Sequence, residues 1–539
     1  MEKTKKNLCL LLATCLLTGL AACGKTAESE ENNNDIVVDD SVSGEVLTSG
    51  NAADNVFSLA IDLEKSLNPI TTRSSLNQMV DNLVYDRLFE VDENFNLSSR
   101  ILEDWYYTKN DSGGGTWVLT VREGIQMHDG STLTSQDIYY SISRAFTQQA
   151  TFYQGQMGRV YVYASGREVY LTGDYANGLL PWRMSVPIIK SVNNSILENV
   201  PIGSGPYTYS EDLTCLEKFD DYEYADQLPV DTIYLRPYTG PEGLITEFES
   251  ALVDVVVNDP TSIYNMGYGG KSEKRVIPTT NLHFIGFNGM SEFFQYESYR
   301  YAMNWIIDRE RIADQELDGA VTASALPIHP NSSLYDTTLA DALAYNPARA
   351  RQELERAGCR DLDADGMLEY ALSGVKMEIN VKFLVCADNP AKVQAARRIA
   401  EDMEAIGLGV NLQELTWKEY LTALEEGEFD MFYGEIGLAP DWNILTLFVG
   451  DRVTDGTLNY GQWSLDTLEN AVYTFIGATE EERPDAETAM IQELSQSAVL
   501  IPICFENKEV ISHLGVITGM KPNQYDPFCD VANWQIHLD

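Results

Sequence analysis

The sequence contains few cysteines and few positive charges for its length of 539 residues. Five cysteines follow residue 23, an odd and widely scattered set that does not form a disulfide framework: Cys215, Cys359, Cys386, Cys504 and Cys529. Cys504 and Cys529 are the candidate pair in an oxidising compartment, although we expect buried free thiols. Lys and Arg number 37 against 82 Asp and Glu, giving a net charge of −45. Such a surface repels phosphate backbones, so we expect no binding to nucleic acid.

Metal-binding and catalytic motifs are also missing. The five histidines show neither an H-E-x-x-H pattern nor a pair at ligand spacing: His128, His283, His329, His513 and His537. No G-x-S-x-G nucleophile motif occurs. We therefore predict no resident metal, no cofactor and no catalytic residue. Folding can still bring distant carboxylates together, so an exported hydrolase, for example a glycosidase, stays open as the alternative.

Two stretches imitate known loops only in part. "NMGYGGKS" ends like a phosphate-binding loop, but Asn265 stands where the first glycine is required, so we predict a surface loop. "DLDADGMLE" begins like a calcium loop with Asp361, Asp363 and Asp365, but Leu372 replaces the bidentate Glu at the twelfth position. We predict a tight acidic turn, with calcium binding as the open alternative.

The N-terminus carries a short apolar run and no spanning segment. Three lysines precede the uncharged residues 8–22, which are too few to cross a bilayer but typical of a signal peptide. The run ends in Leu20-Ala21-Ala22-Cys23, which resembles a bacterial lipobox and implies that Cys23 is acylated after removal of residues 1–22. The acidic, polar residues 23–54 bury too little apolar surface to fold. We predict a flexible tether on an extracytoplasmic membrane surface; the alternative is an ordinary secretion signal.

Beyond the tether, strand and helix patterns alternate, which indicates an α/β fold. We expect strands at 56–62, 116–124, 232–238 and 253–258, and helices at 134–146, 298–314 and 346–358. Two helix–strand pairs follow, at 391–415 and 417–437. The stretch "NPARARQELERAG" shows the helix signals well, with Pro347 in its first turn and Gly358 at its end.

A series of motifs resembles the extracytoplasmic solute-binding proteins of the oligopeptide and dipeptide family, the receptors of ABC importers. The motifs are "SLNP", "VYDRLFEVDENFNLSSRILEDW", "WVLTVREGIQMHDGSTLTSQDIYYSISRA", "PIGSGPYTY", "LHFIGFNGM", "YRYAMNWIIDRERI", "GEFDMFYGEIGLAPDWN" and "LIPICFEN". The resemblance covers nearly the whole body of the chain. It implies two hinged lobes around a large cleft, with an additional domain inserted in the first lobe.

The resemblance also implies a division of the chain. After the signal peptide (1–22) and the tether (23–54), we expect the first lobe at 55–88, 200–288 and 500–539, the inserted domain at 89–199, and the second lobe at 289–499. The region 152–201 is short for the family, and Leu438 stands where many relatives have an aromatic residue. Both differences concern the size of the cleft and the identity of the ligand.

The implied function is capture of a peptide or similar small solute for delivery to an ABC permease, by a monomer. In peptide-binding relatives, the Asp of the segment that matches "APDWN" holds the ligand's ammonium, which places Asp441 in the site with Ala439, Pro440 and Trp442 around it. The alternative is a structural role, in which Asp441 caps a helix and Trp442 belongs to the apolar core. Arg122, His128 and Asp129 are expected to be structural. A non-peptide cargo (oligosaccharide, nickel complex or haem) stays open.

Overall fold

A computed structural model describes residues 36–37, 55–111, 113–147, 159–192, 197–372, 375–449 and 458–538. The expected signal peptide, Cys23 and most of the tether lie outside the described residues. Within the tether, Ile36 and Val37 form a short strand that pairs in parallel with a strand of the main sheet. Within the described ranges, no helix combines the length and the apolar character needed to cross a bilayer.

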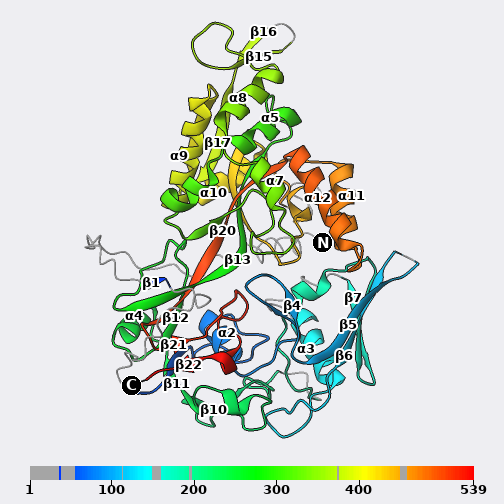
Figure 1. Cartoon of the computed structure of the whole chain (residues 1–539), viewed down its shortest axis with the longest axis vertical. Coiled ribbons are helices and arrows are strands. Elements are labelled where there is room, and N and C mark those ends of the chain that lie inside the picture. Colours follow the sequence, from blue (N-terminus) through cyan, green and yellow to red (C-terminus); the bar gives the residue numbers. More distant parts are fainter. Residues whose placement is uncertain are drawn as a thin grey trace.

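An eight-stranded sheet connects the two ends of the molecule (Figure 1). Its path is β12-β20-β13-β19-β17-β18, with β1 paired to β13 and β14 paired to β20. Its strands are β1 (Ile36–Val37), β12 (Val255–Asn258), β13 (Ser272–Phe287), β14 (Val321–Ala323), β17 (Asn380–Cys386), β18 (Gly409–Leu415), β19 (Met431–Gly437) and β20 (Leu500–His513). The long antiparallel strands β13 and β20 run from one half of the molecule into the other.

Two four-stranded sheets lie at the lower end of the view in Figure 1. The first is β2 (Ser58–Ile61), β11 (Thr232–Pro237), β10 (Cys215–Lys218) and β9 (Tyr207–Tyr209). The second is β5 (Leu102–Lys109), β6 (Gly115–Val121), β8 (Glu168–Gly173) and β7 (Val160–Ser165). Three short hairpins pair β3 (Glu90–Val91) with β4 (Leu97–Ser98), β15 (Glu369–Leu372) with β16 (Val375–Glu378), and β21 (Ile517–Thr518) with β22 (Gln535–Ile536).

The α-helices are α2 (Ser75–Asp81), α3 (Ser135–Thr147), α4 (Pro241–Glu249), α5 (Glu297–Ala302), α6 (Arg309–Arg311), α7 (Thr337–Ala342), α8 (Pro347–Arg356), α9 (Pro390–Ala405), α10 (Trp417–Glu426), α11 (Asp466–Ile476) and α12 (Arg483–Ser497). Short 3₁₀ or π turns are η2 (Leu180–Arg183), η3 (Ala225–Gln227), η4 (Met303–Trp305), η5 (Ile312–Glu316), η6 (Leu445–Leu447) and η7 (Val531–Asn533).

Local sequence explains where several helices begin and end. The Asn346 side chain accepts the Arg349 N–H at 3.0 Å, and Pro347 follows at the first helical position of α8. In α10, Thr416 and Glu419 form a capping box, and Gly427 ends the helix in the left-handed conformation. The single helix expected over 298–314 is wrong. It is divided into α5, η4, α6 and η5, because Asp308 caps a new start by accepting the Arg311 N–H at 3.2 Å.

Each of the two lobes has an apolar core of its own. The first lobe contains the two four-stranded sheets with α2, α3 and α4; its larger core includes Ile277 of β13 and Val510 of β20. The second lobe contains α5 to α12; its core includes Ile285 of β13 and Ile503 of β20. The same two strands therefore contribute to both cores. This mixed α/β, two-lobed architecture is the fold class that the sequence predicts.

Candidate functional site

The acidic residue singled out in "APDWN" lies directly after β19. Ala439 to Trp442 form a tight turn that the Trp442 N–H closes on the Ala439 carbonyl at 3.0 Å. Trp442 has φ +54, and Pro440 occupies the second position of the turn, where its fixed φ is favourable. Thr280 of β13 binds both backbone groups of Leu438, the residue before the turn. The Thr280 carbonyl accepts the Leu438 N–H, and the Thr280 hydroxyl donates to the Leu438 carbonyl at 2.6 Å. The turn is therefore fixed to the central sheet.

The carboxylate of Asp441 is buried and is paired with a cation from the other lobe. Its side chain is 1% exposed and forms a two-pronged ion pair with Arg183 of η2. The Arg183 Nη2 donates to Oδ1 at 3.0 Å, and its Nε donates to Oδ2. Oδ1 also accepts the Asn443 N–H at 3.1 Å. Burial alone lowers the pKa of Arg183, but Asp441 outweighs this effect and the pKa is raised. The pair is a planar, bidentate contact between oppositely charged groups.

The C-terminal segment forms one wall beside this pair. Burial and the nearby Asp441 raise the pKa of the Tyr525 hydroxyl. The neighbouring Gln524 accepts the Thr280 N–H at 2.8 Å, and the Tyr525 carbonyl accepts from Asn82 of the first lobe at 3.1 Å. Residues from four distant parts of the chain thus meet around Asp441.

Trp442 lies in an apolar cluster that joins the lobes. Its ring, 1% exposed, contacts Phe95 of the first lobe and Phe505 of β20 edge-on, at centroid distances of 5.0 and 5.8 Å. His329 contacts the same two phenylalanines at 5.0 and 5.2 Å. The Trp182 indole donates to the Phe95 carbonyl at 3.1 Å. Trp442 therefore packs between the lobes.

Further direct contacts hold the lobes together. The Gly178 N–H donates to the Ile476 carbonyl at 2.7 Å, and the Asn331 amide donates to the Glu93 carbonyl at 3.2 Å. Arg483 donates to the Gly178 carbonyl at 3.3 Å and stacks on the Trp182 ring at 4.9 Å. The contacts connect Gly178 with the ends of α11 and α12, and Glu93 with the segment between β14 and α7.

A second polar cluster lies where β13, β19 and β20 meet. The His283 Nε2 is 2.8 Å from Glu506 Oε1, and its Nδ1 is 2.8 Å from the Tyr433 hydroxyl. Asn281 donates to Glu435 at 2.7 Å and also to Glu506. A bulge in the pairing of β13 with β20 between Pro278 and Leu282 places Asn281 there.

The cluster resembles a metal site but contains its own cation. Ligand atoms of His283, Glu435 and Glu506 lie within 4.8 Å of one another. The Lys392 ammonium bonds to Glu435 and lies 3.6 Å from Glu506. Burial alone raises the pKa of Glu506, but His283, Lys392 and Asn281 outweigh it and lower the pKa to about 2. The Lys392 ammonium thus balances the carboxylate charges that a metal ion would otherwise bind.

The acidic stretch "DLDADG" forms the tight turn that the sequence predicts. Gly366 has φ +96 and donates its N–H to Asp361 at 3.0 Å. Lys376 pairs with Asp363 at 2.5 Å and with the buried Glu369 at 2.7 Å. The charges of the turn are therefore partly neutralised by a lysine of β16.

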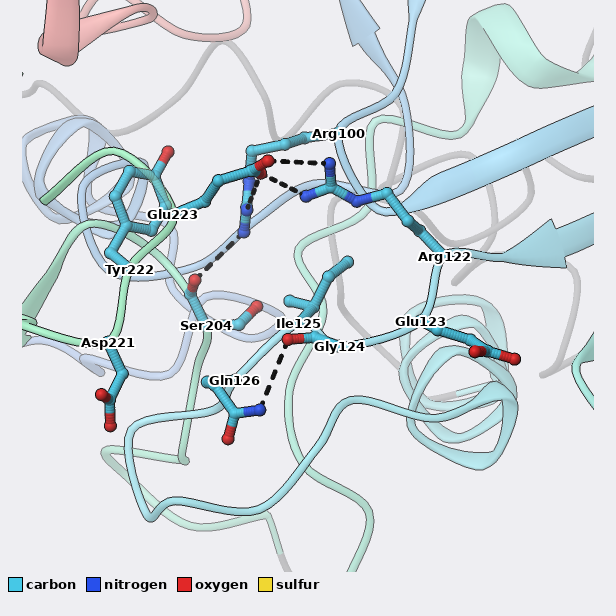
Figure 2. A pocket seen from close by; sticks show the side chains of 10 residues that line it. All are labelled: Arg100, Arg122, Glu123, Gly124, Ile125, Gln126, Ser204, Asp221, Tyr222 and Glu223. Atoms are coloured by element: carbon cyan, nitrogen blue, oxygen red, sulfur yellow. Dashed lines mark hydrogen bonds and ion pairs between the residues drawn. The ribbon is translucent and has the colours of Figure 1, made fainter.

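A separate cavity of about 310 Å³ lies within the first lobe (Figure 2). Both arginines of the lining have partners within it: Arg122 pairs with Glu223, and Arg100 donates to the Ser204 carbonyl at 3.2 Å. Its lining residues all belong to the segments 100–126 and 204–223. The cavity contains none of the residues that the sequence places in the binding site.

Residues of the "REGIQMHDG" motif have structural partners, as expected. The His128 Nε2 is 3.1 Å from the Gly205 carbonyl oxygen, and the His128 N–H donates to the Gly203 carbonyl at 3.0 Å. Asp129 accepts the Ser131 N–H at 3.1 Å and pairs with Lys190. The five described cysteines are free, and Cys504 is fully buried.

The sequence singles out Asp441 as a ligand-binding acid, and the structure places this residue in an ion pair with Arg183. Ala439, Pro440, Asp441 and Trp442 are consecutive and lie together at the end of β19; Pro440 is buried and Ala439 is half-buried. Arg183 was missed because it lies 258 residues from its partner and belongs to none of the motifs. The signal that was available is the "PWR" turn, where a cation stands among buried apolar residues.

Comparison with known proteins adds independent findings. The family model of the bacterial extracellular solute-binding proteins, family 5, matches residues 96–453. The oligopeptide-binding protein AppA of Bacillus subtilis is 24% identical over 412 residues, which are 71% of this chain and 73% of that protein. The di/tripeptide-binding protein 1 of Pseudomonas aeruginosa is 24% identical, over 51% of this chain and 50% of that protein.

A solved structure shows the same fold. The periplasmic murein tripeptide binding protein MppA, in its unliganded open form, superposes with a TM-score of 0.72 at 15% identity. The superposition covers 91% of this chain and 99% of that protein. The two-lobed fold of the described residues is therefore the fold of a known binding protein.

Proposed function

The chain belongs to the bacterial extracellular solute-binding proteins of family 5, and from this premise we propose that it captures a peptide or similar small solute between its lobes. It then delivers the solute to the permease of an ABC importer. The observation that carries the proposal is the ion pair between Arg183 and Asp441. It brings a buried carboxylate of the second lobe against a residue of the first. This supports a site in which a ligand contacts both lobes.

Asp441 is the proposed anchor for the cargo's ammonium group. A buried carboxylate requires a cationic partner, because an uncompensated charge in this position costs about 3–5 kcal/mol. In the structure Arg183 fills that role. An ammonium group from the cargo takes it over when the cargo enters. Ala439 and Pro440 shape the turn around the anchor, and Trp442 supplies an apolar wall. AppA and the di/tripeptide-binding protein 1, both named for peptides, support a peptide as the cargo.

Opening and closing of the lobes is the proposed mechanism of capture. Only the closed form contacts a cargo from both sides, so the cargo stabilises that form. The strands β13 and β20 belong to both cores and act as the connection about which the lobes move. We propose that the cargo is released unchanged. A lipid on Cys23 holds the receptor at the extracytoplasmic surface of the cell membrane. The acidic tether sets the distance between the membrane and the folded lobes.

The decisive experiment identifies what the protein carries. We expect native mass spectrometry of freshly purified protein to show one intact small solute per chain, recovered unchanged after denaturation. Incubation with a defined mixture of di- to pentapeptides should deplete particular members stoichiometrically. Repeated cleavage of any of them by catalytic amounts of protein contradicts the proposal and supports the exported hydrolase instead.

A second experiment tests the anchor. Asp441→Asn keeps the size of the side chain but removes its charge, so we expect it to weaken binding of the identified cargo at least about 100-fold, as the loss of a buried charge partner predicts. Asp485→Asn is the matched control, because Asp485 is an exposed acid in the first turn of α12. Equal affinity of both variants removes Asp441 from the site.

A further inference from the structure

We propose that residues 36–37 form an anchor strand, which fastens the membrane tether to the first lobe by pairing with the edge of β13 and so keeps the receptor close to the bilayer. The inference rests on the proposed function in one respect, which is the lipid on Cys23. It adds a second point of attachment, on the folded part of the chain. The occupant of this edge is therefore a segment of the chain itself.

The first step is that β13 extends beyond one of its two long neighbours. β20 pairs with β13 from Ser272 to Gly286, whereas β19 pairs with it only from Asn281 to Phe287. Among the described residues, β1 is the only strand that pairs with the other edge of β13 before Asn281. A strand edge that no long neighbour covers can accept a further strand through its backbone groups.

The second step is the pairing at this edge. Ile36 lies opposite Glu273 and Val37 lies opposite Lys274, in parallel (Figure 1). Both β13 residues also pair with β20, so β1 and β20 lie on opposite sides of β13. The tether thus extends the main sheet by one strand and does not compete with β20.

The third step is that the tether sequence suits this position. Residues 36–38, "IVV", are its longest apolar run, and β-branched residues favour extended strands. In the sequence, Asp35 directly precedes β1 and the exposed Lys271 directly precedes β13. A parallel pairing therefore aligns residues of opposite charge, which stabilises neighbouring strands.

Chain length determines what the pairing does. An extended chain spans at most about 3.6 Å per residue, so it reaches at most about 47 Å from Cys23 to Ile36 and about 115 Å from Cys23 to Asn55. The anchor strand therefore reduces the largest distance between the lipid and the first lobe by more than half. A short pairing suffices for this, because the covalent connection keeps the local concentration of the strand high.

The attachment point belongs to the first lobe. Ile277 of β13 and Val510 of β20, close to the paired residues, are buried in the core of that lobe. Ile285, farther along β13, belongs to the core of the second lobe. We therefore expect the second lobe to close on a cargo independently of the anchor strand.

Hydrogen–deuterium exchange on the full mature chain without lipid, as the variant Cys23→Ser, tests the pairing. The double substitution Ile36→Pro and Val37→Pro removes both backbone N–H groups of β1 and disfavours the strand. We expect amide exchange in the β13 peptide 272–277 to become at least about fivefold faster, because this edge then opens to solvent. Exchange in 281–287, which lies between β19 and β20, should not change.

The matched control is the double substitution Val46→Pro and Leu47→Pro, which adds the same two prolines to the tether outside β1. We expect it to exchange like the parent protein. Equal exchange of peptide 272–277 in the parent and in both double variants, all folded by circular dichroism, overturns the inference.

Neutron reflectometry of the lipidated chain on a supported bilayer tests the role of the pairing. The root-mean-square length of a flexible polar chain grows with about the square root of its residue number, so Ile36→Pro and Val37→Pro should widen the gap between bilayer and protein about 1.5-fold. The control should keep the gap of the wild type. An equal gap in all three proteins overturns the role in positioning.

Failure of this inference is distinguishable from failure of the proposed function. Cargo affinity of both double variants should stay within about twofold of the wild type, because distant sites act independently. A greater loss of affinity in the β1 variant alone overturns the independence of the second lobe. If mass spectrometry finds no lipid on Cys23, the proposed anchoring is wrong and the membrane role of the anchor strand falls with it, whereas hydrogen exchange still decides whether β1 pairs.

Discussion

At the scale of the single residue, the interface between the lobes depends on the charge state of His329. Its ring is 1% exposed and lies between Phe95 and Phe505, and its Nδ1 accepts the Asn331 N–H at 3.1 Å. Burial lowers the pKa of His329 from 6.5 to about 4. A neutral imidazole fits this environment, whereas an imidazolium loses its hydration without gaining a partner.

We predict that His329 makes stability fall as the pH drops from about 6.5 to about 4. The unfolded chain takes up the proton first, because its histidine has the higher pKa, so acid favours unfolding in this window. A difference of about 2.5 pKa units corresponds to about 3 kcal/mol at most. Urea unfolding of wild type and His329→Gln at pH 7 and pH 4 measures the effect. Identical pH slopes in the two proteins contradict the prediction.

Single residues also show the limit of sequence analysis. The sequence singles out Asp441 because its motif is intact, but it does not predict the turn that holds this residue. Arg183 could not be predicted, because its role depends on a contact between residues 258 positions apart. No local pattern distinguishes an arginine that bonds across an interface from one that is solvated at the surface.

At the scale of the element, the two strands shared by both lobes contain a buried polar cluster rather than a continuous apolar face. Glu506 of β20 bonds to His283 of β13, and Lys392 of α9 lies nearby. The bulge between Pro278 and Leu282 interrupts the regular pairing and makes room for Asn281. The strands therefore carry fixed hydrogen bonds at the point where the lobes are connected.

We predict that Glu506→Gln destabilises the protein by about 3–5 kcal/mol, because it removes the charged partner of the Lys392 ammonium and of His283. The pKa of Glu506, lowered to about 2, means that its stabilising effect is full above about pH 4.5 and is lost as the pH falls towards 2. Denaturant unfolding at pH 7 measures the loss.

The matched control for this variant is Glu414→Gln on β18 of the same sheet. Glu414 pairs with Arg397 at the surface, with side chains 34% and 47% exposed. Exposed pairs contribute about 0–1 kcal/mol, so this variant should unfold almost like the wild type. Equal destabilisation by the two substitutions shows that the buried cluster has no special role.

Elements with clear end signals were the most predictable ones. The predicted α8 and α10 exist, with the capping residues and glycines that their sequences indicate. The region 298–314 shows the opposite case. Its apolar periodicity continues, but Asp308 stops one helix and starts another, because a side chain that caps a backbone N–H competes with helix continuation.

At the scale of the whole molecule, the structure shows the lobes in direct contact. Polar bonds at Gly178 and Asn331, the aromatic cluster at Trp442 and the ion pair at Asp441 all cross between the lobes. A cargo shifts the balance between open and closed forms only by its preference for one of them. These contacts therefore set how much of a cargo's binding energy is needed for closure.

We predict that Gly178→Ala favours the open form. Gly178 lies against the backbone at the end of α11, and an added Cβ would lie far inside van der Waals contact with the Ala478 carbonyl oxygen. Because that neighbour is backbone, the lobes must separate to accommodate the methyl group. We expect a larger radius of gyration by small-angle X-ray scattering and at least about tenfold weaker cargo binding, which corresponds to about 1.4 kcal/mol.

In the control Gly437→Ala, the new Cβ has its nearest neighbour at 3.8 Å, so the radius should not change. An unchanged radius of gyration in Gly178→Ala contradicts the prediction, because the contact at Gly178 then does not control the separation of the lobes.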